Sequence, residues 1–186
     1  MEEISVPMSA ADTPAAERNQ DESYLAAARE FGPALTRLAK AYEANEELRR
    51  DLLQEVHLAL WRSLAVFDGR CALRTWVYRV AHNVAASHVQ RQRRWGTGLC
   101  GLDQIEEKPA PDDTERSHDE RGTLEKLYAL IHSLKPLDRE VISLFLEDLD
   151  AKSIAEITGL SPGAVATKVH RIKTLLASRF AAQERT

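Results

Sequence analysis

The chain has 186 residues, 44% of them hydrophobic and 6% aromatic, and its 25 Lys and Arg against 29 Asp and Glu give a formal net charge of -4. This length and composition favour one or two small helical domains over a large β sandwich. The chain shows no signal peptide, no apolar run of the roughly 20 residues that a membrane helix needs, and no metal-binding cysteine cluster. We therefore expect a cytoplasmic protein with reduced thiols and no membrane insertion.

Residues 1–22 are expected to form a disordered acidic tail, followed by a helix over Tyr24–Tyr42 with a bend at Gly32-Pro33. A second helix is predicted over Glu46–Phe67, because apolar residues recur there at spacings of 4, 4, 4, 4 and 3: Leu48, Leu52, Val56, Leu60, Leu64 and Phe67. The face left outward is either solvated or suited to an arginine-rich partner helix, and it consists of Asp51, Gln54, Glu55 and Leu58.

A third helix is predicted over Ala72–Arg94, after a turn at Asp68-Gly69. One face is apolar and is expected to meet the core: Leu73, Val77, Val80 and Val84. Another face carries an aromatic ring, amides and guanidiniums: Trp76, Arg79, Asn83, Gln90 and Arg94. Stacking on aromatic rings combined with arginine contacts is how proteins hold unpaired bases. The alternative for Trp76 is that it covers the core.

Charge is segregated along the chain. No Asp or Glu occurs in Gly69–Leu102 or in Ser161–Gln183, whereas Asp103–Glu120 between them is mostly acidic. Either basic stretch alone could be a solvated surface. Two such stretches in one acidic chain favour a nucleic-acid partner, because cations that neutralise phosphates release counterions. The acidic tail and linker would discourage binding to arbitrary DNA.

The second helical block is predicted over residues 122–180, between a linker at residues 96–121 and a short tail at residues 181–186. Its helices are expected at Thr123–Ser133, Leu137–Glu147, Ala151–Thr158 and Pro162–Phe180. Gly159 suits a left-handed helix end, and Ser161 suits the start of the next helix. The last two helices therefore resemble a helix-turn-helix, whose second helix presents a polar, basic face to DNA: Thr167, Lys168, His170, Arg171, Lys173 and Thr174.

The order of these parts resembles the extracytoplasmic-function (ECF) group of bacterial RNA polymerase sigma factors, in the sigma-70 family. The resemblance lies in DLLQEVHLALW (Asp51–Trp61), LRTWVYRVAHNVAASHVQRQRR (Leu73–Arg94) and the segment Ser133–Leu176. It implies an all-α fold of two small helical domains joined by a flexible acidic linker. Residues 23–95 would form a three-helix, region 2-like domain for core binding and promoter melting, and residues 122–180 a four-helix, region 4-like domain with the helix-turn-helix.

The resemblance also implies partners and residue roles. Core RNA polymerase would be bound through its β′ clamp helices and its β subunit, with Asp51, Gln54, Glu55 and Leu58 facing the clamp helices. Residues for -10 recognition and melting would be Arg70, Arg74, Trp76, Arg79, Asn83, Arg91, Arg93 and Arg94. Residues for the -35 element would be Thr167, Lys168, His170, Arg171, Lys173 and Thr174. An anti-sigma factor is a further expected partner. The chain departs from the family pattern at His57, Ser87 and Ala166.

Two other classes of function compete with this interpretation. A stand-alone helix-turn-helix regulator would need only the second block, and it would leave the acidic and arginine-rich faces of the first block without a role. An enzyme is disfavoured, since the six histidines are scattered and no acid, base and nucleophile set is visible. We expect no cofactor, no metal and no catalytic residue.

Overall fold

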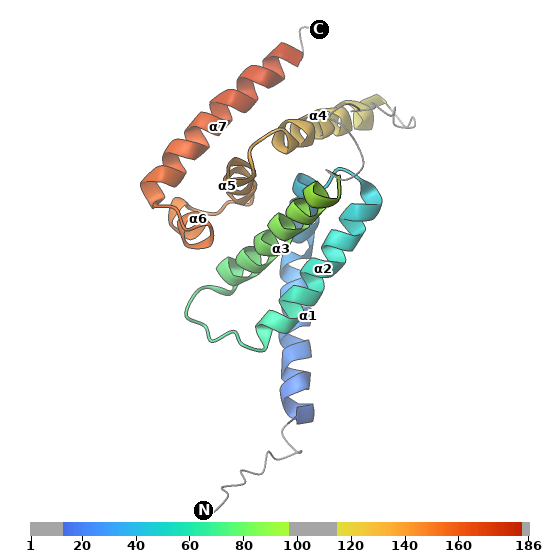
Figure 1. Ribbon diagram of the computed structural model, residues 1–186, viewed down its shortest axis with the longest axis vertical. Coiled ribbons are helices and arrows are strands. Elements are labelled where there is room, and N and C mark those ends of the chain that lie inside the picture. The colour runs from blue at the N-terminus through green and yellow to red at the C-terminus, as the bar shows by residue number, and fades with distance from the viewer. Residues whose placement is uncertain (1–12, 97–114, 184–186) are drawn as a thin grey trace, which may run out of the picture.

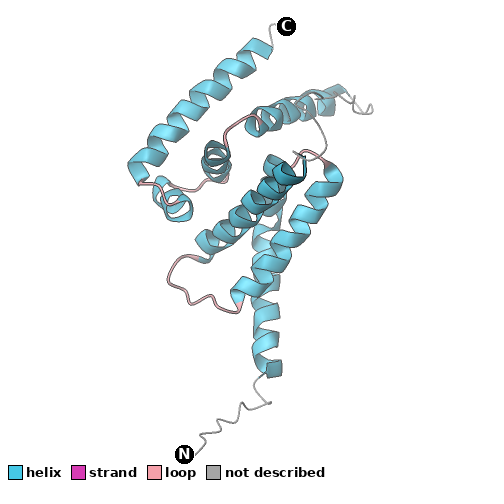
Figure 2. Ribbon diagram, in the orientation of Figure 1, coloured by secondary structure: helices cyan, strands magenta, loops and turns pink. Residues whose placement is uncertain are grey.

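The computed structural model describes residues 13–96 and 115–183, and every regular element within those two ranges is an α-helix (Figure 2). The all-α prediction is therefore confirmed. In chain order the helices are α1 (Thr13–Tyr42), α2 (Glu46–Leu64), α3 (Leu73–Gly96), α4 (Glu115–His132), α5 (Pro136–Leu146), α6 (Ala151–Thr158) and α7 (Pro162–Gln183).

Helices α1, α2 and α3 pack against one another around an apolar core (Figure 1). The predicted stripe of α2 supplies part of this core, since Leu52, Val56 and Leu60 are buried. Helix α2 starts after Asn45, whose side-chain oxygen accepts a hydrogen bond from the Leu48 N–H at 3.1 Å. That bond satisfies one of the amide groups that a helix start leaves unpaired.

Helix α1 begins at Thr13, inside the segment that we expected to be a disordered tail. Its early turns lie against α2: Gln20 donates to the Trp61 carbonyl at 2.8 Å, and Trp61 donates through Nε1 to Asp21 at 2.8 Å. These bonds join residues about forty positions apart, so the local composition of the tail gave no sign of them. The tertiary contact, rather than helix propensity, explains why this part of the tail is ordered.

The predicted linker is shorter than expected at its C-terminal end, because α4 already begins at Glu115. The remainder of the predicted tail and linker, residues 1–12 and 97–114, lies outside the described residues, as do Cys100 and residues 184–186. Cys71 lies within them as a free, half-buried thiol.

Helices α4 to α7 form a second packed group, and α6 and α7 make the predicted helix-turn-helix. The Asp150 side chain caps α6 by accepting from the Ser153 N–H at 2.8 Å. Gly159 ends α6 with φ at 75°, a left-handed conformation that glycine adopts at little cost. Ser161 then starts α7 by accepting from the Ala164 N–H at 3.2 Å.

The two helical groups also pack on each other. Helix α3 lies against α6, α1 lies against α4, and both α1 and α3 contact α5 (Figure 1). His132 of α4, for example, bonds through Nε2 to the Lys40 carbonyl of α1 at 2.8 Å. Consequently one side of α3 faces the helix-turn-helix group rather than solvent.

Candidate nucleic-acid interface

Three arginines of α3 that were predicted to contact promoter DNA are bonded to oxygen atoms of the protein itself. Arg74 donates through Nη2 to the main-chain carbonyl of Glu147, and Arg79 donates through Nη2 to the Glu156 carbonyl at 2.9 Å. Arg91 forms an ion pair with Glu55 of α2. The first two bonds connect α3 to the C-terminal ends of α5 and α6.

The other polar residues predicted for this surface lie on its exposed rim. Asn83, Arg93 and Arg94 are exposed on α3. Arg70 lies in the preceding loop, where its Nε pairs with Asp68 at 2.5 Å. The structure thus places these cations along one helix and the loop before it, an arrangement that suits a polyanionic strand.

Trp76 is held by packing as well as by a hydrogen bond. Its ring lies 5.4 Å from that of Phe67 between centroids, and its Nε1 donates to Ser63 Oγ at 3.1 Å. The side chain is half-buried. Part of the ring therefore covers the core, which was the alternative that the sequence left open, while the rest reaches the surface.

The buried face of α3 is rotated from the predicted apolar stripe. Within that stripe Val77 is fully buried, whereas Leu73, Val80 and Val84 are half-buried and lie at the margin of the buried face. The fully buried positions of α3 also include polar and aromatic groups: Thr75, Tyr78, His82 and His88. The periodicity was misleading because buried polar groups with partners elsewhere in the chain, such as His82 with Tyr42 and His88 with Glu43, were not counted as core.

His82 is the most enclosed of these polar groups. Its Nδ1 lies 2.9 Å from the Tyr42 hydroxyl, and burial lowers the pKa of His82 to about 3. Burial likewise raises the pKa of Tyr42. Both side chains are therefore neutral at physiological pH, as buried titratable groups without a charged partner generally are.

Helix α7 buries Val165, Ile172 and Leu176 and turns its polar face outward, as predicted. The exposed side chains on that face are Thr167, His170, Arg171, Lys173 and Thr174, and Lys168 is half-buried.

A single acid on α5 lies under this face. Asp138 accepts from Lys168 Nζ at 2.5 Å and from Arg171 Nη2 at 2.9 Å, and its own side chain is only 12% exposed. Lys173 lies over the Phe145 ring, with Nζ 5.3 Å from its centroid. The pairing with Asp138 holds the two cations at the edge of α7 that faces α5, because a buried carboxylate needs charged or hydrogen-bonding partners.

The outward face of α2 is exposed at all four predicted positions. A groove beside it is lined by Gln54, His57 and Leu58 of α2 together with Tyr24 and Leu25 of α1. Leu25 and Leu58 are 49% and 47% exposed, which is high for large apolar side chains. Leu25 was missed because we placed it on the first helix without assigning it a face.

His57, for which the resemblance implied a departure from the family pattern, lies in this groove. Its Nδ1 lies 3.1 Å from the Tyr24 hydroxyl, with the two rings edge to face. Burial lowers the pKa of His57. The imidazole is thus neutral and hydrogen-bonded, and it forms a polar spot between apolar neighbours.

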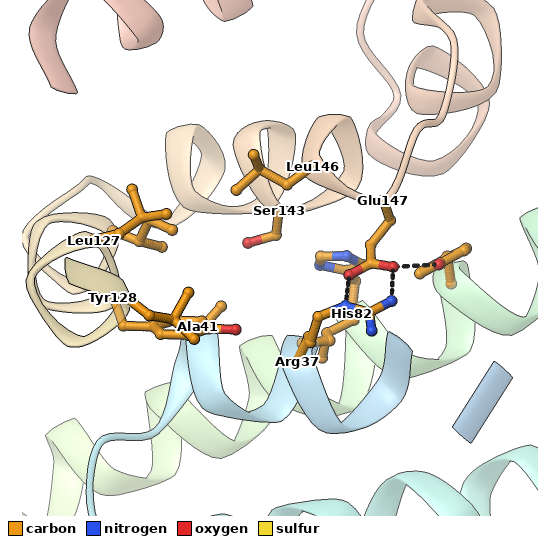
Figure 3. Close-up of a pocket in the computed structure, with 12 residues that line it drawn as sticks. Arg37, Ala41, His82, Leu127, Tyr128, Ser143, Leu146 and Glu147 are labelled. Carbon is orange, nitrogen blue, oxygen red and sulfur yellow. Dashed lines mark hydrogen bonds and ion pairs between the residues drawn. The ribbon is translucent and has the colours of Figure 1, made fainter. Parts of the chain in front are cut away.

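Glu147, which the sequence did not single out, lies where the two helical groups meet (Figure 3). Its carboxylate accepts two bonds from Arg37 of α1, at 2.7 and 2.6 Å, and one from the Tyr78 hydroxyl at 3.3 Å. A cavity of about 180 Å³ adjoins this cluster, with His82 and Ser143 among its lining residues. Within the described residues, His82 Nε2 and Ser143 Oγ have no hydrogen-bond partner.

The part of the chain that the structure describes contains no group of three or more His, Cys, Asp or Glu side chains placed to hold a metal ion. None of its helices is long and apolar enough to span a membrane.

Comparison with known proteins matches both helical groups to one family. Residues 27–95 match the model of sigma-70 region 2, and residues 124–176 match that of sigma-70 region 4. Together these matches cover more than half of the chain. The chain therefore belongs to the sigma-70 family of RNA polymerase sigma factors and, within it, to the ECF group.

Individual relatives agree with this assignment. The ECF RNA polymerase sigma-E factor of Haemophilus influenzae is 27% identical over 147 residues, which cover 70% of this chain and 73% of the relative. The RNA polymerase sigma factor NccH of Alcaligenes xylosoxydans is 28% identical and covers 78% of this chain and 80% of its own length. The fold resembles that of the sigma factor RpoE of Bartonella quintana, solved with the anti-sigma factor NepR, with a TM-score of 0.67, 18% identity and coverage of 84% of this chain and 96% of that one.

Proposed function

We propose that this chain is a dissociable subunit of RNA polymerase that directs promoter-specific transcription initiation. It binds core polymerase, recognises the -35 and -10 elements and helps to melt the promoter DNA. The observation that carries the proposal is the occurrence of sigma-70 regions 2 and 4, in family order, in one chain. A protein that combines these two regions can contact polymerase and both promoter elements.

The residue roles follow the surfaces described above. The exposed face of α2, with Asp51, Gln54, Glu55 and Leu58, would meet the β′ clamp helices, because an acidic rim around an apolar centre suits a basic helical partner. The face of α3 that carries Asn83 and Arg79 would hold the unpaired strand, with these two residues near bases and the terminal arginines on phosphates. The outer face of α7 would enter the major groove of the -35 element.

Regulation and location follow from the same proposal. Sigma factors are non-enzymatic initiation factors, so we assign the chain no catalytic role. It would act where the polymerase acts, in the cytoplasm. The solved relative is bound to an anti-sigma factor, and we propose a partner of that kind for this chain as well.

The direct test is binding of the purified, folded chain to core RNA polymerase. Asp51→Arg reverses a charge on the proposed polymerase face, and we expect it to weaken binding by about 30-fold or more, the effect of a typical interface hot spot. Glu125→Arg makes the same charge change on an exposed position of α4 and serves as the control, with affinity near that of the natural chain.

Failure of the unaltered chain to bind core polymerase would contradict the proposal. Tight binding of the free chain to a palindromic duplex would then favour the stand-alone regulator, which uses the helix-turn-helix alone.

A further inference from the structure

The cavity of about 180 Å³ beside the Arg37–Glu147 ion pair is lined by residues of α1, α3, α4 and α5 (Figure 3). Most of its wall is apolar, and these side chains come from α1, α4 and α5: Leu38, Ala41, Leu124, Leu127, Ile131 and Leu146. Side chains that adjoin a void lose van der Waals contacts, so protein interiors contain few of them. An apolar cavity of about 150 Å³ is large enough to bind benzene, so this volume suits one aromatic ring with a small substituent.

Two buried polar groups in the wall have no hydrogen-bond partner within the described residues. They are Nε2 of His82 on α3 and Oγ of Ser143 on α5, and these residues are only 2% and 7% exposed. A buried donor or acceptor without a partner costs free energy that a suitable ligand recovers. Because both residues line the same cavity, a molecule that fills it meets both.

Ser143 differs from other hydroxyls inside the helices of this chain. Ser87 and Thr158, for example, each donate to the carbonyl oxygen four residues earlier, at 2.8 Å in both cases. Such a bond is a common way for a hydroxyl inside a helix to find a partner. The Ser143 hydroxyl instead points from α5 into the cavity (Figure 3). It can therefore donate to or accept from a molecule there.

His82 presents an uncharged ring nitrogen to the same cavity. Burial lowers the pKa of His82 to about 3, so the imidazole carries a single ring proton at physiological pH. Its Nδ1 lies 2.9 Å from the Tyr42 hydroxyl. A phenolic hydroxyl is a better donor than acceptor, so Tyr42 donates to Nδ1 and the imidazole proton lies on Nε2. The Nε2–H group is thus a donor for a ligand oxygen.

The charges beside the cavity already have partners. The Glu147 carboxylate accepts two bonds from Arg37, at 2.7 and 2.6 Å, and one from the Tyr78 hydroxyl at 3.3 Å. A charged ligand would lose its hydration without gaining an ion partner. The lining therefore favours a neutral molecule whose apolar body carries one oxygen.

The cavity is reached from solvent past apolar side chains. Leu124 of α4 and Leu146 of α5 line it and are 46% and 50% exposed, which is high for leucine. An apolar solute can enter between them without unfolding of the chain.

We propose that this cavity is a binding site for a small neutral molecule of the phenol class, with one aromatic ring and one oxygen substituent. The ring packs against the leucine side chains. The oxygen accepts from His82 Nε2–H and exchanges a second hydrogen bond with Ser143 Oγ. The site gives the chain a chemical input of its own, and the inference does not depend on binding to polymerase or DNA.

The test measures binding of phenol and of toluene to the full-length chain by isothermal titration calorimetry. The two molecules have nearly the same shape, and only phenol carries an oxygen. We expect saturable binding of phenol and about tenfold weaker binding of toluene, because toluene leaves both polar groups unpaired. Phenol should also raise the midpoint of thermal unfolding, since a ligand that binds only the folded chain stabilises it.

Three variants locate the site. Ser143→Ala should fold, because it replaces an unpaired buried hydroxyl with a methyl group, and it should lower the preference for phenol over toluene several-fold. Ala41→Met fills the cavity with a flexible apolar side chain and should abolish binding of both molecules. Ser178→Ala is the control, because Ser178 lies on α7 and donates to the Leu175 carbonyl at 2.8 Å. It should bind phenol like the natural chain.

Each contrary outcome is distinct. Absence of saturable phenol binding by the folded natural chain would overturn the inference. Equal affinities for phenol and toluene, unchanged in Ser143→Ala, would remove the role of the polar groups and with it the proposed ligand class. Phenol binding that persists in folded Ala41→Met would place the molecule elsewhere. Binding to core polymerase is measured separately, so none of these results decides the proposed function.

Discussion

Glu55 of α2 and Arg91 of α3 form an ion pair, with side chains 45% and 50% exposed. Glu55 belongs to the face that we assign to polymerase, and Arg91 to the face that we assign to DNA. An exposed pair of this kind contributes roughly 0.2–1 kcal/mol, so its role in stability is small. Because this ion pair links the two faces, a substitution at Glu55 also releases Arg91. A substitution at Asp51 alone therefore gives the cleaner test of the polymerase surface.

Asn83→Ala tests the strand-binding role of α3 without disturbing the contacts between the two helical groups. The Asn83 amide is exposed, whereas the Arg79 guanidinium is bonded to the Glu156 carbonyl of α6. We expect unchanged affinity for core polymerase and about tenfold slower formation of the open complex, since a good amide contact to a base edge contributes roughly 1–3 kcal/mol. Permanganate footprinting measures the unpaired thymines, and unchanged melting would remove Asn83 from the site.

Arg171→Ala tests the outer face of α7. We expect the holoenzyme to bind -35 duplexes more weakly and the slope of log affinity against log salt to fall by about one, as for loss of one phosphate contact. Fluorescence anisotropy at several salt concentrations measures both. Arg179→Ala, further along the same helix, is the control, because Arg179 donates to Ser133 Oγ at 2.8 Å. Equal effects of the two changes would argue against a recognition role for Arg171.

Gly159→Ala tests the turn of the helix-turn-helix. With φ at 75°, an alanine here meets strain although no atom lies within 4 Å of its new Cβ, and we expect a loss of about 1 kcal/mol of unfolding free energy. An added Cβ at Gly163 also meets no atom within 4 Å, but Gly163 lies inside α7 and has no positive φ. Gly163→Ala should therefore stabilise the chain by up to about 1 kcal/mol. Urea unfolding measures the free energy of unfolding of both variants. A change of the same sign in both would contradict the role that we assign to the positive φ of Gly159.

The buried His82 makes stability depend on pH. Because its folded pKa of about 3 lies below the ordinary 6.5, the unfolded chain takes up the proton first, and stability falls as pH drops below 6.5 toward 3. The slope from this group reaches about 1.4 kcal/mol per pH unit. Lowered pKa values of His57 and His132 act in the same direction.

His82→Asn is the matched variant, since an amide can still meet the Tyr42 hydroxyl but does not titrate. Urea unfolding of both proteins between about pH 5 and pH 7.5 should give a shallower dependence for the variant. Burial raises the pKa of Glu140, but this residue is present in both proteins. Its contribution to the pH dependence of stability therefore cancels in the difference between them. Identical slopes would show that His82 remains accessible to protons in the folded chain.

Much of the local structure could be predicted from the sequence. Ala151–Thr158 was predicted with the helix bounds observed, and the second helix of the pair was predicted from Pro162. The Gly159 turn, the Ser161 cap and the outward polar face of α7 follow from short-range rules of backbone conformation, capping and periodicity. The outward face of α2 was predicted for the same reason, since its buried stripe repeats every three to four residues.

Other features depend on contacts between residues that are far apart in sequence. The start of α1 depends on Trp61, the buried polar face of α3 depends on Tyr42, and Glu147 gains its role from Arg37, 110 positions away. No local pattern encodes such a pairing, because hydrogen bonds and ion pairs require only that two groups meet in space. Local sequence patterns set which helices form and where their charges lie along the chain, whereas the packing of the two helical groups sets which of those charges meet oxygen atoms of the chain itself.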